Sequence, residues 1–281
     1  MQVKQEPVLT LAAIKEAQVK LNRLNDGRKI RNDAEACRFI NERGFVLLMP
    51  VEDIPLPSLS RADDAAPWGG FAITDRAWAW KETLPGNKLC AYSKLIHGRG
   101  TFISWDLYPS FLKVYGPEGD PDYEYENGRL DKSERELYHL VDNFGPIDSR
   151  ELWRMAKSIF GDKRTRFTAT LEKLQSRFYL TVAGGSLEGW TLHTWDLVER
   201  QVPSEILTKL PPKSEAKMNI LWQTIQNSYA ISERKLRSIL RWSPLELEQS
   251  LAILKESRRV TEVRIVNEPQ VWFTATGECL N

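Results

Sequence analysis

The chain has 281 residues, enough for two or three small domains that each bury a core. Hydrophobic residues make up 42% of it and charged residues 27%, which is ordinary for a soluble globular protein. The formal net charge of +1 excludes a global positive field that recruits phosphates. Any affinity for nucleic acid must therefore come from local patches.

The cysteines and histidines give no sign of a disulfide framework or a metal site. Cys37, Cys90 and Cys279 are odd in number, widely spaced and form no CxxC pair. The histidines lack metal-ligand spacing, and the chain has no Gly-rich phosphate loop and no Ser or Cys nucleophile motif. We therefore expect no metal, no cofactor and a reducing, cytoplasmic location. With neither a signal peptide nor a membrane-spanning apolar run, we expect no membrane association.

Residues 1–120 are expected to form an N-terminal domain that opens with helices. An amphipathic helix over 9–24 and a polar, basic loop over 25–32 precede a short helix that Asp33 caps and Gly44 closes. The apolar run 45–49 predicts a buried strand or extended segment, cut by Pro50. An irregular region follows, marked by prolines and glycines: Pro55, Pro57, Pro67, Gly69 and Gly70.

The rest of this domain is expected to alternate helix and strand. A helix that begins near Trp78 is broken at Pro85-Gly86 and resumes over 89–96. A strand over 99–103 and a short helix over 105–114 come next. The Gly- and Pro-rich stretch after it predicts a domain boundary within 115–131.

Residues 131–200 have the pattern of a complete winged helix. Helices are predicted from Asp131 and from Asp148, where Glu151 stands at capping-box spacing, and a third follows Gly161-Asp162. A hairpin over 179–195, with its turn at 184–189, follows as the wing. Because the third helix is basic, this arrangement fits a major groove and its phosphates.

The pattern is repeated in residues 214–281. One helix carries Met218 and Ile225, Ser232 caps the next, and Ser243-Pro244 begins the third. Two alternating strands, 260–266 and 270–274, close the unit. The N-terminal segment is interpreted as a third, more divergent copy with a Pro-rich insertion. The fold class expected is mainly α with small β-hairpin wings, in tandem winged helix-turn-helix domains.

Short motifs in a characteristic order resemble the AlkZ/YcaQ-like family, most of all its AlkZ-related proteins. They are Arg43-Gly44-Phe45-Val46, Arg99-Gly100-Thr101-Phe102 followed by Asp106-Leu107, Gly145 to Leu152, and a last unit closing on Val271-Trp272. The resemblance spans nearly the whole chain. It implies tandem winged helices and a relation to DNA glycosylases that act on bulky alkylation damage and interstrand crosslinks.

The resemblance also locates the residues where the family's chemistry is expected. Active members carry Gln-x-Gln or Gln-x-Asp after a Gly-aliphatic-Val segment, and the pair positions a water against the deoxyribose. Read without gaps, this chain has Leu47 and Met49 there, and neither activates water. A gapped reading places Glu52 or Asp53 near that position, although a solvated loop after a buried strand explains them better. The family's His after the second motif is replaced by Ile103, and His97 precedes the strand.

Double-stranded DNA, damaged or distorted, is the expected partner of a chain that we expect to be monomeric. Two groups of candidate contacts carry this expectation as clusters, whereas each residue alone is better explained as part of a solvated face: Lys163, Arg164, Arg166, Thr168 and Lys173, then Arg234, Lys235, Arg237 and Arg241. Three functions compete. They are a DNA-binding protein without glycosylase activity, a glycosylase that uses Glu52 or Asp53, and a regulator or protein-docking scaffold.

Overall fold

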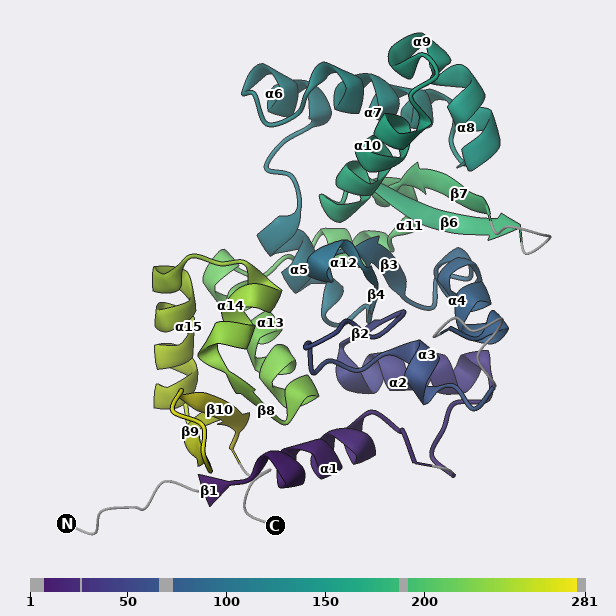
Figure 1. The fold of residues 1–281 in the computed structure, drawn as a ribbon. Helices are drawn as coiled ribbons and strands as arrows, with labels where there is room; N and C mark the ends of the chain where they lie inside the picture. Colours follow the sequence, from purple (N-terminus) through teal and green to yellow (C-terminus); the bar gives the residue numbers. More distant parts are fainter. Residues whose placement is uncertain (1–7, 26, 66–72, 187–191, 277–281) are drawn as a thin grey trace.

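The chain is mostly helical with small sheets (Figure 1). The computed structural model describes residues 8–25, 27–65, 73–186 and 192–276. The features expected at 67–70, 187–190 and Cys279 lie outside the described residues. Before the first repeated unit, β1 (Val8–Leu9) and α1 (Leu11–Leu21) run along one end of the molecule. β1 pairs in parallel with β9 near the other end of the sequence.

One order of elements occurs three times along the chain: a helix, a short strand, two or three helices, and two more strands. The first unit contains α2 (Asp33–Arg43), β2 (Phe45–Leu47), α3 (Leu59–Ala62), α4 (Asp75–Gly86), β3 (Ala91–Lys94) and β4 (Gly100–Ile103). The single turn η1 (Ile96–Gly98) joins its last two strands. In the sheet, the order is β2-β4-β3, so the first strand pairs with the third.

The second unit follows two connecting helices, α5 (Tyr108–Tyr115) and α6 (Pro121–Glu126). It contains α7 (Lys132–Phe144), β5 (Ile147–Asp148), α8 (Ser149–Met155), α9 (Lys157–Phe160), α10 (Arg164–Ser176), β6 (Leu180–Ser186) and β7 (Leu192–Leu197). Asp131 and Glu134 form a complete capping box that starts α7. The helix predicted from Asp148 is interrupted at Ala156, so it forms the two helices α8 and α9.

The third unit follows α11 (Val198–Gln201) and α12 (Ser204–Leu207). It contains α13 (Lys213–Ser228), β8 (Ala230–Ser232), α14 (Glu233–Leu240), α15 (Pro244–Glu256), β9 (Val260–Ile265) and β10 (Trp272–Ala275). Ser243 and Glu246 form a second capping box, with Pro244 in the first turn of α15. In each of the three sheets the first strand of the unit pairs with the third.

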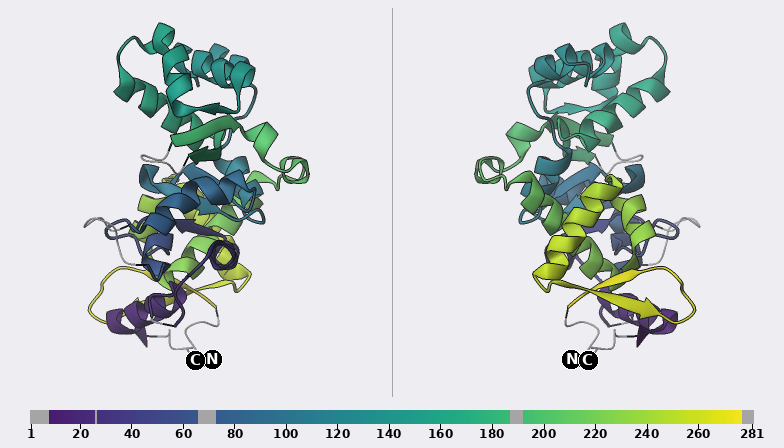
Figure 2. Two further views of the ribbon diagram at one scale, coloured as in Figure 1. Left: turned by 90° about the vertical axis from the view of Figure 1, so that its right-hand side faces the viewer. Right: turned by 90° about the vertical axis from the view of Figure 1, so that its left-hand side faces the viewer.

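The sheet of the first unit is the centre of the molecule, with the second unit beyond one face and the third beyond the other. Alternate residues of β2 enter different cores: Val46 joins the core shared with the second unit, whereas Phe45 and Leu47 join the core shared with the third. Side chains of a strand point alternately to its two faces, so both faces of this sheet are buried. The apolar run 45–49, predicted to be buried, is explained by this position. Figure 2 shows the second unit at one end of the molecule and α1 at the other.

One helix predicted from the sequence is wrong. Residues 89–96 do not resume a helix, because β3 (Ala91–Lys94) pairs antiparallel with β4. Leu89 and Ile96 lie seven residues apart, a spacing that also occurs on one face of a helix. A strand partner supplied from nine residues downstream overrides this local pattern.

Candidate nucleic-acid interface

The exposed face of α14 bears cations and lies near the place where the three units meet. The helix starts at Ser232, whose hydroxyl accepts a hydrogen bond from the Lys235 amide at 3.4 Å. Leu236, Ile239 and Leu240 are buried, so α14 is fixed with its other face outward. Arg234 and Ser238 are spaced at i and i+4 and share that exposed face, and the exposed Arg241 caps the end of the helix in a left-handed conformation.

A hollow of about 340 Å³ lies between this face and the loop that follows β2. Glu52 and Asp53 line it from the loop, and Arg234 and Lys235 line it from α14. The Lys235 ammonium contacts the backbone carbonyl of Asp53 and lies 3.7 Å from its Oδ1. The structure thus brings both carboxylates singled out in the sequence together with two of the candidate DNA-binding cations.

His97 is a member of this hollow that the sequence did not assign to it. Its Nε2 lies 3.3 Å from the hydroxyl of Ser238 on α14. The residue has a φ of 51°, a left-handed conformation within η1. Only the tertiary packing of η1 against α14 places the imidazole here, because the two residues are 141 positions apart in the chain.

The carboxylates of the hollow are open to water. The Asp53 side chain is 91% exposed, and Glu52 is also exposed. Hydrolysis by a carboxylate benefits from a site that excludes bulk water, and the described residues do not enclose this one. By contrast, Leu47 is fully buried and Met49 packs against the other core. The two positions where the family's catalytic pair is expected, when the motif is read without gaps, therefore hold apolar residues packed into the cores.

A second hollow, of about 330 Å³, extends the interface along α14 to the second unit. Arg241 lines it from the C-cap of α14, Lys94 from β3 and Ser176 from the end of α10, so all three units contribute to it. Lys94 also forms an ion pair with Glu172 of α10 at 3.3 Å. Cations from two units are therefore gathered around one junction.

The five candidate residues of the second unit divide into two groups. Arg166 donates a hydrogen bond to the Ser133 hydroxyl at 2.7 Å, and Lys173 forms an ion pair with the buried carboxylate of Glu134. Both attach α10 to α7. Lys163 and Arg164 are exposed and have no ion-pair partner among the described residues. The exposed Thr168 hydroxyl donates to the Arg164 carbonyl at 3.1 Å.

The four candidates on α14 also differ in their partners. Arg237 pairs with Glu233 within the helix at 2.7 Å, and Lys235 is occupied by Asp53. Arg234 and Arg241 have no ion-pair partner in the part of the chain that the structure describes, and both are exposed. The following helix, α15, is acidic at Glu246, Glu248 and Glu256. The candidate cations of the third unit therefore lie on α14 and at its end, and not on α15.

A buried charged cluster between the first two units escaped the sequence analysis. Lys81 and Glu82 of α4 are 3% and 1% exposed, and they form an ion pair with each other. His193 of β7 places its Nδ1 2.9 Å from Oε2 of Glu82. Burial favours a raised pKa for Glu82, but the hydrogen bond and charge of His193 and the charge of Lys81 outweigh it and lower the pKa. No local pattern signals this cluster, because its partner lies 111 residues away.

Two kinds of feature are absent from the described residues. No group of three His, Cys, Asp or Glu side chains among them is placed to hold a metal ion. Within the same residues, no helix combines the length and apolar character needed to cross a bilayer.

These observations define a mostly helical protein with small sheets. Comparison with known proteins shows the family to which it belongs. The family model described as AlkZ related matches residues 30–241, and the chain belongs to the AlkZ-related family. Its fold is similar to that of the Streptomyces sahachiroi DNA glycosylase AlkZ, with a TM-score of 0.60 and 14% sequence identity. The similarity covers 95% of this chain and 70% of that one. A search of curated proteins found no match.

Proposed function

We propose that this protein binds double-stranded DNA in a repair-associated role, without the catalytic pair usual among its glycosylase relatives. The observation that carries the proposal is the junction along α14, where exposed cations of the third unit meet the loop after β2 and His97 of the first. Phosphate contacts from such cations supply most of the affinity of a DNA-binding protein. Leu47 and Met49, packed into the cores, support the loss of the catalytic pair.

We further propose that the three repeated units are winged helices. Their common strand order, with the first strand paired to the third, supports this assignment. Units at 131–200 and 214–281 then follow an N-terminal domain, 1–120, that holds the divergent copy. In the second unit, α10 is the helix that enters a groove, and Lys163, Arg164 and Thr168 are its outward residues. In the third unit, we propose that the contacts come from α14, the second helix of that unit, through Arg234 and through Arg241 at its end.

Fluorescence anisotropy with a short labelled duplex, plain or carrying an abasic-site analogue, tests the proposal. Wild type should bind, and log K should fall linearly with log salt concentration. The double variant Arg234→Ala/Arg241→Ala should weaken binding and reduce the slope by about 0.9 for each phosphate that the protein no longer neutralises. A matched control, Lys209→Ala/Lys213→Ala, removes two exposed lysines of the linker and α13. Equal effects of the two double variants would contradict a specific interface on α14.

The outcome also separates the competing functions. Tighter binding to the abasic analogue supports lesion recognition, and a large preference for one sequence supports a transcription regulator. Absence of binding at low salt leaves a protein-docking scaffold.

We also propose that the protein is a cytoplasmic monomer, in agreement with the free thiols of Cys37 and Cys90. Light scattering coupled to gel filtration measures the oligomeric state.

A glycosylase that uses Glu52 or Asp53 is the second candidate function. It is favoured by their position, since both line the hollow that also holds His97 and the cations of α14. In this case Glu52→Gln and Asp53→Asn should abolish base release from alkylated duplex while leaving DNA affinity intact. Base release that survives both changes would exclude this mechanism.

A further inference from the structure

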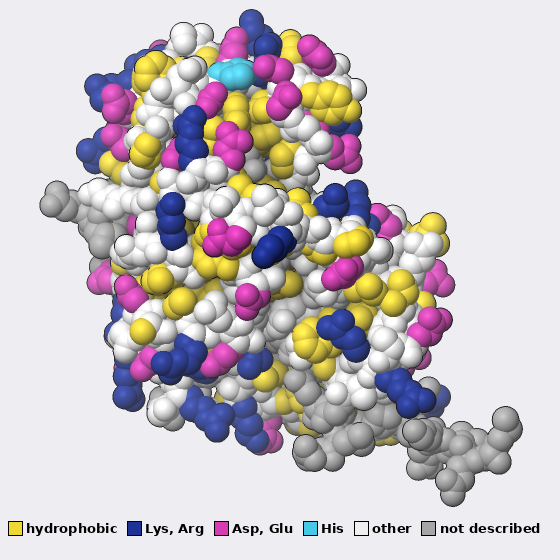
Figure 3. Space-filling model, turned by 180° about the vertical axis from the view of Figure 1, so that it is seen from behind, with side chains coloured by type: hydrophobic (Ala, Val, Ile, Leu, Met, Phe, Trp, Pro, Cys, Tyr) yellow, Lys and Arg dark blue, Asp and Glu magenta, His cyan; other side chains and the backbone are white. Residues whose placement is uncertain are grey.

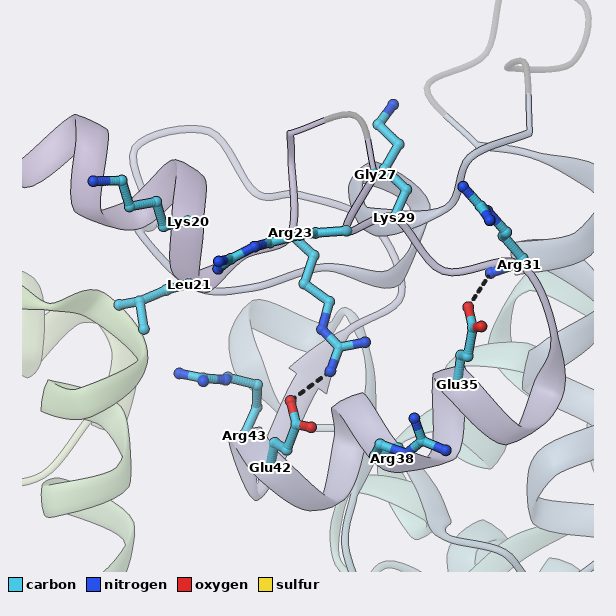
Figure 4. A pocket seen from close by; sticks show the side chains of 11 residues that line it. Lys20, Leu21, Arg23, Gly27, Lys29, Arg31, Glu35, Arg38, Glu42 and Arg43 are labelled. Atoms are coloured by element: carbon cyan, nitrogen blue, oxygen red, sulfur yellow. Dashed lines mark hydrogen bonds and ion pairs between the residues drawn. The ribbon is translucent and has the colours of Figure 1, made fainter.

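A separate hollow of about 400 Å³ lies between the end of α1, the following loop and α2 (Figure 4). We call it the α1–α2 groove. Its described lining contains seven cationic side chains and two carboxylates: Lys20 from α1, four cations from the loop, and Arg38 and Arg43 from α2, with Glu35 and Glu42. Lys and Arg side chains gather at the lower left of the view from behind, which is the side of α1 and α2 (Figure 3). Seven cations in one hollow are a strong local concentration for a chain whose net charge is +1.

Both carboxylates of the groove already serve its own framework. Glu42 pairs with Arg23 at 2.6 Å, and the Arg23 guanidinium also lies 5.1 Å from the ring centroid of Phe39. Glu35 accepts a hydrogen bond from the Arg31 backbone amide at 2.8 Å. These contacts hold the loop in place against α2. They also mean that the groove is shaped before any ligand arrives.

Three cations of the groove remain available to a ligand. Arg28, Lys29 and Arg38 have no ion-pair partner among the described residues, and Arg28 and Arg38 are exposed. Arg38 projects from α2 and Lys29 from the loop that follows α1 (Figure 4), and Arg28 belongs to the same loop, so the cations of the lining come from two elements. Guanidinium groups bind phosphate oxygens through paired N–H donors, and an ammonium group adds a point charge.

We infer that the α1–α2 groove binds backbone phosphates of DNA as a second contact outside the α14 interface. This inference rests on the proposed function and extends the protein's footprint on the nucleic acid. A polyanion with several phosphates matches a hollow that carries several cations on two sides. A membrane surface fits less well, because an amphipathic membrane-binding segment places apolar side chains beside its cations, and Leu21 is the one apolar member of the described lining.

The test compares two triple variants with equal loss of charge. Arg28→Ala/Lys29→Ala/Arg38→Ala removes the available cations of the groove. Lys209→Ala/Lys213→Ala/Arg258→Ala removes three exposed cations elsewhere, none of which has an ion-pair partner in the described chain. On a long duplex, the groove variant should bind more weakly. The slope of log K against log salt concentration should decrease in magnitude by about 2–3, because each neutralised phosphate contributes about 0.9. The control variant should bind as wild type does.

Lysine footprinting adds a readout that does not depend on affinity. Saturating duplex should protect Lys20 and Lys29 from an amine-acylating reagent, while Lys209 and Lys213 stay reactive. If wild type binds duplex but the groove variant keeps its slope and Lys29 stays reactive, this inference fails and the proposed function stands. If wild type binds no duplex at low salt, the proposed function fails first. Binding of the groove to anionic vesicles but not to duplex would overturn the inference in favour of a lipid surface.

Discussion

Nδ1 of His193 lies 2.9 Å from Oε2 of Glu82, and this contact joins β7 of the second unit to α4 of the first. The other oxygen of Glu82 binds Lys81, so one buried carboxylate has two basic partners. The cluster lies where α4 packs against the strands of the second unit, and Figure 1 shows this proximity. The cluster is therefore one of the contacts between the first and second units.

Glu82→Gln should lower the free energy of unfolding by about 3 kcal/mol. The change keeps the shape of the side chain but removes the buried negative charge that pairs with Lys81 and His193, and breaking a buried pair from one side costs about 3–5 kcal/mol. Urea denaturation followed by fluorescence measures the effect. Glu172→Gln, which removes an exposed partner of Lys94, is the control and should cost less than about 1 kcal/mol. Equal effects of the two changes would show that the buried cluster is not a stabilising contact.

Stability should fall as the pH drops below about 6.5, because of His193. Burial lowers the pKa of His193, and the positive charges of Lys81 and Lys94 add to this, against the opposing effect of Glu82. A histidine with a lowered pKa in the folded state takes up protons more readily when unfolded. Its contribution is therefore complete above its usual value of 6.5 and is lost as the pH falls toward the folded-state pKa. The melting temperature of wild type should drop between pH 7.5 and 5.5, and that of His193→Asn should drop less. A parallel decline in both proteins would rule this out.

A further loss of stability is expected in stronger acid at the start of α15. The Lys217 side chain, together with the backbone and hydroxyl of Ser243, lowers the pKa of Glu246 to about 2. Its stabilising contribution is present above the usual value of 4.5 and is lost as the pH falls from 4.5 toward 2. Glu246→Gln should therefore flatten the stability profile in that range, as measured by denaturant titrations. Glu248→Gln, on the same helix and exposed, should leave the profile unchanged.

The two groups of candidate residues at α10 should respond differently to alanine substitution: one group should lose stability and the other DNA affinity. Lys173→Ala leaves the carboxylate of Glu134, which is 1% exposed, without its cation, so stability should fall by about 1–3 kcal/mol. Lys163→Ala and Arg164→Ala should change stability by less than about 0.5 kcal/mol, since both side chains are exposed. DNA affinity should fall for this second pair. A Lys173→Ala protein as stable as wild type would contradict the structural role assigned to this lysine.

Leu47→Gln tests the expectation that Leu47 replaces a catalytic glutamine and serves only the core. The side chain is fully buried among apolar residues, so an amide placed there lacks partners and should cost about 2–3 kcal/mol. Met49→Gln should cost less, because Met49 is only partly buried. Thermal denaturation ranks the variants. A Leu47→Gln protein as stable as wild type would mean that this site still accommodates a polar side chain.

The sequence by itself determined the local elements and the family. Capping residues, apolar periodicity and turn residues predicted the helices of the second and third units, because these signals act within a few residues of one another. The ordered motifs led to the AlkZ-related family, which the family model confirms over residues 30–241. The charge of α10 was also visible, although not which of its cations face solvent.

The tertiary structure alone decided which charges are free and which are shared. Lys173 and Arg166 turn to α7, His97 reaches Ser238, and His193 reaches Glu82 across 111 residues. The strand at Ala91–Lys94 likewise formed against a helical local pattern, because β4 supplied its hydrogen bonds. Ion pairs and strand pairing depend on proximity in space, and packing of the three units sets that proximity. Local sequence carries the propensity of a segment but not the identity of its distant partner.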